Sequence, residues 1–185
     1  MRKGNLLQTS CWKRRVGWIK SIFRFVHLSA GDLLREEQET KSKDSELIKS
    51  YIKEGKIVPV EITCRLLLKA MQKKGMDKKF LIDGFPRNLD NMEGWNKVMS
   101  GHANVKQVLF FDTSEEVMLQ RIMKRAETSG RADDNVETAK KRFRTFNEET
   151  MKVINIYDGK KIVWKIDATQ GIDEVYQDVK KKIAV

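Results

Sequence analysis

The sequence feature that most constrains the fold is a three-residue apolar run, Phe80–Ile82, which ends directly in the turn sequence Asp83–Arg87. So short a run between polar segments predicts a fully buried strand rather than a helix. The glycine and the proline that follow predict that the chain turns sharply where the strand ends. A strand buried on both faces is typical of a parallel sheet with helices on either side.

The rest of the chain repeats this alternation. We expect strands at 26–28, 80–82, 105–111 and 161–166, and helices from Asp32, over 44–53, from Pro59, from Ser114, over 136–157 and over 172–183. Strands that alternate with helices predict an α/β fold with a parallel sheet covered by helices on both faces. At 185 residues the chain is long enough for one domain with a sizeable core.

The formal net charge of +11 invites a nucleic-acid interpretation. Seven of the cations lie in residues 1–26, which contain no acidic residue, so the remainder carries only +4. Such a balance is ordinary for a protein that handles polyphosphates, and we expect no specific nucleic-acid partner. Two cysteines and two histidines make a structural zinc site improbable, and no apolar run is long enough to cross a bilayer.

Arginines gather near the breaks between predicted strands and helices. Arg87 follows the strand end at Gly84, and Arg35 lies one turn inside the helix that follows Gly31. Arg125, Arg131 and Arg142 surround the polar break at 130–135. A single arginine on a helix is usually solvated. Several beside the carboxyl ends of parallel strands, where α/β proteins bind ligands, indicate a phosphate clamp suited to phosphoryl transfer.

Four segments in order, 27–35, 55–59, 83–91 and 129–135, resemble the adenylate kinase superfamily, and within it most closely the UMP/CMP kinases. The likeness runs from about residue 25 to residue 179. It implies a P-loop kinase fold in residues 25–185, with a part that binds the nucleoside monophosphate at about 29–58 and a small lid at about 125–135. Residues 1–24 form an atypical basic segment.

The resemblance also implies roles for individual residues. The monophosphate acceptor would be held by Arg35, Lys56, Ile57, Val58, Gly84, Phe85, Pro86, Arg87 and Asn91. Asn91 stands where adenylate kinases have a glutamine that reads adenine, and an asparagine there is the pyrimidine pattern. The acceptors would therefore be CMP and UMP, with dCMP a further candidate.

The transferring phosphoryl group would be neutralised by Arg87, Arg125, Arg131 and Arg142 as the lid closes, and a closed lid excludes water. ATP would contact Arg125 and the backbone of Gln170. Mg²⁺ would enter with ATP, and Asp83 would reach it through water without binding it directly. The family likeness further suggests a monomer in the cytoplasm, with a nuclear or mitochondrial location left open.

One part of the family pattern is missing from the printed sequence. The superfamily begins with a central strand and a glycine-rich P-loop that ends Gly-Lys-Gly-Thr and cradles the ATP phosphates. No such loop occurs here: Lys56 is followed by Ile57, and Lys160 by Lys161. Because residues 1–25 are rich in cations, we expect the first central strand to be lacking as well.

Three explanations stay open. The chain can be a pseudokinase that binds nucleotide without catalysis, can carry a targeting or splice-variant N-terminus, or can reflect a misread gene. Codons for Arg2–Leu6 exist that encode Gly-Lys-Gly-Thr when read one base downstream. We therefore expect a Mg²⁺-dependent ATP:CMP/UMP phosphotransferase with doubtful activity in this chain, or a non-catalytic nucleotide-binding protein.

Overall fold

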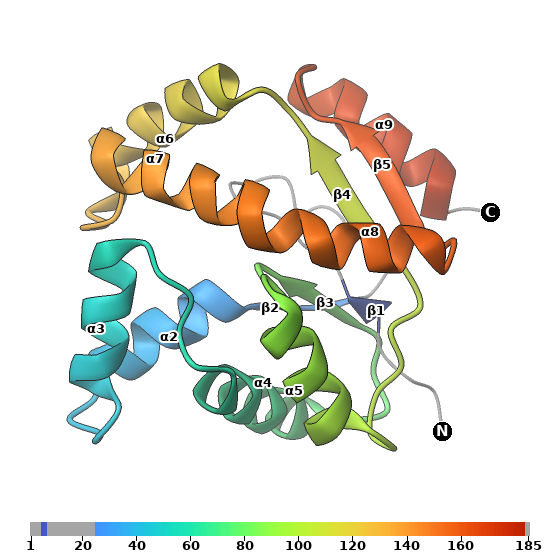
Figure 1. Cartoon of the computed structure of the whole chain (residues 1–185). Coiled ribbons are helices and arrows are strands. Elements are labelled where there is room, and N and C mark those ends of the chain that lie inside the picture. The colour runs from blue at the N-terminus through green and yellow to red at the C-terminus, as the bar shows by residue number, and fades with distance from the viewer. Residues whose placement is uncertain (1–4, 7–24, 184–185) are drawn as a thin grey trace.

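The computed structural model describes residues 5–6 and 25–183. Five parallel strands form the centre, with β1 (Asn5–Leu6), β2 (Val26–Ser29), β3 (Phe80–Asp83), β4 (Val108–Asp112) and β5 (Val163–Asp167). β3 pairs with β2 on one side and β1 on the other, and β4 pairs separately with β5. β1 also contacts β4, so the two sheets adjoin in the order β2-β3-β1 and β4-β5 (Figure 1).

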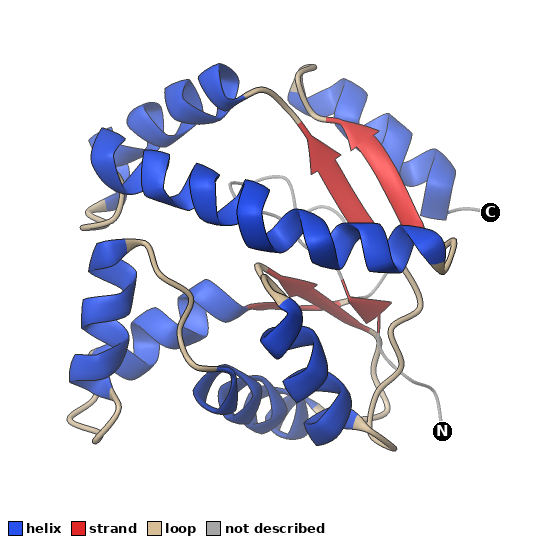
Figure 2. Cartoon of the chain, in the orientation of Figure 1, coloured by secondary structure: helices blue, strands red, loops and turns tan. Residues whose placement is uncertain are grey.

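The helices follow the strands as expected for an α/β fold (Figure 2). They are α2 (Ala30–Gln38), α3 (Ser45–Glu54), α4 (Val60–Lys74), α5 (Leu89–Met99), α6 (Glu115–Ser129), α7 (Val136–Thr145), α8 (Met151–Gly159) and α9 (Ile172–Ile183). A π-helical segment, η1 (Phe146–Thr150), joins α7 to α8. Among the described residues, no helix is both long and apolar enough to span a membrane.

Adjacent residues of β3 face opposite sides of the sheet, and this places helices on both faces. Phe80 and Ile82 pack with Cys64 and Leu67 of α4 and Trp95 of α5. The residue between them, Leu81, is fully buried in a second cluster. That cluster joins β4 and β5 to α9 and includes Leu109, Ile166, Val175 and Val179. The predicted architecture is therefore confirmed.

The expected loss of the first central strand is wrong for two residues. Asn5 and Leu6 lie in parallel register with Leu81 and Ile82 of β3. Strand pairing uses backbone N–H and C=O groups, so a neighbourhood rich in cations does not prevent a short stretch from pairing. Apart from Asn5 and Leu6, the atypical basic segment predicted over residues 1–24 lies outside the described part of the chain.

Several boundaries differ from the sequence-based expectation by two or three residues. α2 begins at Ala30 rather than Asp32, because the Ser29 hydroxyl caps it by accepting a hydrogen bond from the Asp32 amide at 3.3 Å. α3 ends as expected at Gly55, whose φ of 69° is the left-handed conformation that glycine adopts readily. The expected single helix over 136–157 is the continuous run α7–η1–α8.

Candidate nucleotide site

A polar cavity lies where α2, the α3–α4 loop and the turn after β3 meet, and we call it the arginine cavity. Its lining includes Gly31, Arg35, Lys56, Ile57, Val58, Gly84, Phe85, Arg87, Asn91, Asp133 and Arg142. Eight of the nine residues expected to hold the acceptor are in this lining. The ninth, Pro86, is buried in the same turn behind a cis peptide bond with Phe85. The predicted acceptor residues are thus brought together around one space.

The turn after β3 is built around Arg87. Gly84 has a φ of 76°, and its carbonyl accepts a hydrogen bond from Arg87 Nε at 2.8 Å. A β-carbon at Gly84 would lie 3.1 Å from Arg87 Nη2, so both the backbone conformation and the close approach favour glycine. Asn88 caps α5 by accepting from the Asn91 amide at 2.9 Å, and Asn91 Oδ1 accepts from the Arg87 amide at 3.2 Å.

Arg87 is the most strongly perturbed cation of the site. Burial, together with repulsion from Arg142 and Arg35, lowers its pKa to about 10, and the attraction of Asp83 and Asp133 offsets part of this effect. A pKa of about 10 keeps the guanidinium charged at neutral pH. A buried cation next to other cations is stabilised by any anion that enters, and this is the electrostatic property that a phosphate site requires.

The predicted lid arginines are each paired with a carboxylate. Arg125 Nε donates to the buried Asp134 at 2.8 Å, and Ser129 donates to the same carboxylate at 2.6 Å. Arg142 pairs with Asp133 at 3.0 Å. Burial alone would raise the pKa of Asp134, but the hydrogen bonds from Arg125 and Ser129 outweigh it and hold the pKa below its ordinary value.

One pair connects the lid to the acceptor part. Asp32 on α2 accepts from Arg35, its neighbour one turn further on, and from Arg131 of the lid at 3.2 Å. Burial, together with repulsion from Arg35 and Arg125, lowers the pKa of Arg131. Of the five expected arginines, the structure brings Arg35, Arg87 and Arg142 together in the lining of the arginine cavity. Arg125 and Arg131 are in the lining of neither this cavity nor the second one described below, and are instead paired with Asp134 and Asp32.

Asp83 stands at the carboxyl end of β3, and 10% of its side chain is exposed. Its Oδ2 lies 3.8 Å from Nε2 of His27 on the neighbouring strand. Within the described residues no group of three or more acidic, histidine or cysteine side chains is placed to hold a metal ion. A single carboxylate next to a phosphate site fits a Mg²⁺ that keeps most of its waters and takes phosphate oxygens as its other ligands.

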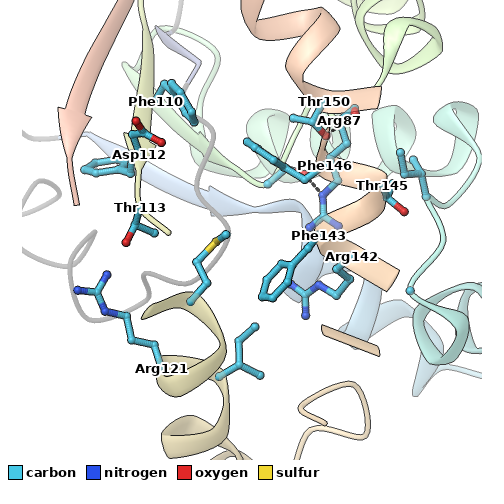
Figure 3. Close-up of a pocket in the computed structure, with 16 residues that line it drawn as sticks. Arg87, Phe110, Asp112, Thr113, Arg121, Arg142, Phe143, Thr145, Phe146 and Thr150 are labelled. Atoms are coloured by element: carbon cyan, nitrogen blue, oxygen red, sulfur yellow. Dashed lines mark hydrogen bonds between the residues drawn. The ribbon is translucent and has the colours of Figure 1, made fainter. Parts of the chain in front are cut away.

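A second cavity, the aromatic cavity, adjoins the first at the carboxyl end of β4. Its lining includes Phe110, Phe111, Asp112, Thr113, Met118, Arg121, Ile122, Phe143, Phe146 and Thr150. Arg87 and Arg142 line both cavities. In Figure 3, Arg87 and Thr150 lie together on one side of the space, and Arg121 lies on the other.

The structure adds Arg121 to the residues expected from sequence. Its guanidinium donates to the backbone carbonyls of Ala168 at 2.7 Å and of Thr169 and Gln170 at 3.4 Å. The backbone of Gln170, which we expected to meet ATP, is thus attached to a cation that faces the aromatic cavity. Arg121 precedes Arg125 by four residues on α6, so a shared helical face was the signal that could have found it.

The fold and these two cavities define a protein that binds phosphorylated ligands at the carboxyl edge of a parallel sheet. The Adenylate kinase family profile matches residues 15–162, and this chain belongs to the adenylate kinase family. It is 54% identical to a UMP-CMP kinase from Danio rerio over 163 residues, which is 85% of this chain and 83% of that protein. It is 50% identical over 164 residues to one from Rattus norvegicus (86% and 84%) and 49% identical over 162 residues to one from Homo sapiens (85% and 83%).

The family assignment confirms the resemblance and the phosphotransferase class of the chain.

Proposed function

We propose that this chain binds CMP or UMP in the arginine cavity as the acceptor for the γ-phosphoryl group of ATP. We also propose that transfer is slow or absent, because the printed sequence lacks the Gly-Lys-Gly-Thr loop. The observation that carries the proposal is that Arg87 and Arg142 line both cavities. A phosphoryl group that passes from one ligand to the other would remain next to these two guanidinium groups throughout.

In this proposal the acceptor phosphate replaces carboxylates as the partner of the arginines. Arg35 and Arg87 hold the acceptor phosphate, while Arg125, Arg131 and Arg142 surround the phosphoryl group in transit. Arginines positioned in advance stabilise the charge that spreads over the equatorial oxygens during in-line transfer. Asp83 would hold a Mg²⁺ that enters with ATP by accepting hydrogen bonds from its waters, and the ion would supply positive charge against the phosphates.

The base of the acceptor would lie near Asn91, which is 3% exposed and belongs to the cavity lining. Its Oδ1 is engaged by the Arg87 amide. The same side chain therefore both braces the phosphate-binding turn and meets the ligand, so base recognition and phosphate binding are adjacent in one turn of chain. This arrangement suits a pyrimidine, whose single ring brings the hydrogen-bonding edge of the base nearer to the phosphate than the two rings of a purine do.

The proposal is tested by measuring CMP and ATP separately by calorimetry, and transfer by a coupled assay with both. We expect saturable CMP binding, weak ATP binding and little product. Arg87→Lys should weaken CMP binding. The control Arg65→Lys, at an exposed residue of α4 that pairs with Asp44, should not. Turnover at the rate of an ordinary kinase would refute the assignment of weak transfer, and absence of CMP binding would refute the acceptor site.

The missing loop favours a second candidate, a non-catalytic nucleotide-binding protein. It shares the acceptor site and predicts CMP binding with no product at any ATP concentration. Product that increases with ATP concentration would exclude it.

A further inference from the structure

The π-helix η1 carries a buried hydroxyl that contacts the phosphate-binding turn. Thr150, the last residue of η1, is 2% exposed, and its Oγ1 donates to the carbonyl oxygen of Arg87 at 2.6 Å. The two residues are 63 positions apart in the chain. A short, buried hydrogen bond between distant segments fixes their relative position more firmly than an exposed one would.

The π-helical turn explains why this hydroxyl faces Arg87. A π turn contains one residue more than an α turn, and each extra residue rotates the following side chains by about 100° around the helix axis. Phe146, at the start of η1, stacks on Phe110 of β4 with ring centroids 6.1 Å apart. The segment is therefore attached to β4 at one end and to the turn after β3 at the other, as the labelled side chains in Figure 3 show.

Arg87 is held at three points. Its amide donates to Asn91 Oδ1 at 3.2 Å, its carbonyl accepts from Thr150, and its Nε donates to Gly84 O at 2.8 Å. Two of these contacts are local, because Gly84 and Asn91 are three and four positions from Arg87 in the sequence. The Thr150 hydrogen bond joins the turn to the α7–η1–α8 run, which also carries Arg142. Thr150 thus relates Arg87 to the second arginine that lines both cavities.

We propose that Thr150 is a positioning residue for acceptor binding: its hydroxyl holds the Arg87 peptide so that the guanidinium points into the arginine cavity. The inference rests on the proposed function for its effect on CMP, whereas the position of Arg87 can be measured without any ligand. Thr150 touches no reacting atom in this scheme and acts through Arg87.

The test compares the full chain with Thr150→Val, Thr150→Ser and Thr145→Val. Valine has the shape of threonine without the hydroxyl, and serine retains the hydroxyl. Thr145 lies on the same helical run, but its hydroxyl donates to Lys141 O of its own helix at 3.0 Å. Two quantities are measured: the NMR signal of the Arg87 Nε–H group, assigned by its absence in Arg87→Lys, and the CMP dissociation constant by calorimetry.

We expect Thr150→Val to shift or broaden the Arg87 Nε signal and to weaken CMP binding roughly fivefold to tenfold, the effect of one net hydrogen bond. Thr150→Ser should restore both, and Thr145→Val should leave the Arg87 signal in place. An unmoved Arg87 signal in folded Thr150→Val, or an equal shift in Thr145→Val, would overturn the proposal.

Two further outcomes are also decisive. Should Thr150→Val fail to fold, Thr150→Ser carries the test, because a displaced Arg87 signal despite the retained hydroxyl would contradict the proposal. Should the unaltered chain bind no CMP, the acceptor function fails, while the Arg87 signal still decides whether Thr150 positions that residue.

Discussion

The two halves of the carboxyl edge of the strands differ in how far their ion pairs are exposed to solvent. Around β2, β3 and the lid, the ion pairs of the arginines are largely shielded from solvent: the Asp134 side chain is 0% exposed and accepts hydrogen bonds from Arg125 and Ser129. Beside β4 and β5, Lys165 pairs with Asp112 at 2.8 Å, but their side chains are 67% and 46% exposed. The side proposed for the acceptor is therefore held by its own carboxylates, whereas the side proposed for the ATP donor consists of an aromatic cavity with a solvated rim.

The two cavities also differ in which of their expected binding elements the sequence supplies. The arginine cavity receives its predicted residues from segments within 30–142. For the ATP that we propose beside the aromatic cavity, the printed sequence supplies no Gly-Lys-Gly-Thr loop. We therefore expect changes on the two sides to have very different consequences.

The largest expected effect comes from supplying the donor loop. A chimera that carries the family's first strand and Gly-Lys-Gly-Thr loop in place of residues 1–24 should raise kcat by more than about a thousandfold, because several donors to the phosphates return together. A coupled CMP and ATP assay measures it. The matched control replaces the loop lysine of the chimera with alanine, and equal activity of the two chimeras would contradict the prediction.

A large effect on stability is expected at Asp134. Asp134→Asn leaves the Arg125 guanidinium without its carboxylate and should lower the free energy of unfolding by about 3 kcal/mol at pH 7. Glu137→Gln, in an exposed pair with Lys141, is the control and should have little effect. Urea unfolding measures both, and equal midpoints for the two variants would show that burial does not distinguish these pairs.

The pH dependence of the same pair has a definite sign. The pKa of Asp134 is lowered from 3.8, so its contribution is complete above about pH 4 and is lost as the pH falls through the lowered value. The unaltered chain should lose stability in that acid range, and Asp134→Asn should lose less. Parallel slopes of unfolding free energy against pH would count against this contribution.

A moderate effect is expected at Arg87. Arg87→Lys keeps a cation but loses the planar fork and the bond to Gly84 O, so CMP should bind about thirtyfold more weakly. Calorimetry measures the change, and far-UV circular dichroism checks the fold. Unchanged affinity would mean that the phosphate does not contact this residue.

The smallest effect, on stability, is expected at the exposed pair of Lys165 and Asp112. Lys165→Ala should move the urea midpoint by less than about 0.3 M, since exposed ion pairs contribute little. A larger shift would mean that the two sides of the edge are more alike than their burial indicates.

Local sequence was sufficient to predict a site residue where that residue lies close to a glycine at the end of a strand. Gly31 marked Arg35, and Gly84 marked Arg87, because tight turns at strand ends leave a composition signal. Arg121 had a weaker signal in its spacing to Arg125. Thr150 had none, since its partner is distant in sequence and a π turn does not disturb the apolar pattern of so short a segment. β1 was missed because its pairing depends on the backbone.

The two-residue length of β1 has a consequence for how the molecule unfolds. In the described part, β1 pairs with β3 and touches β4, but β4 and β5 exchange their strand hydrogen bonds only with each other. Cooperativity between two sheets requires contacts strong enough that neither opens alone. So short a pairing leaves the buried cluster of Leu81 with Leu109 and Ile166 to couple the two sheets, so that they open together only while this apolar packing holds.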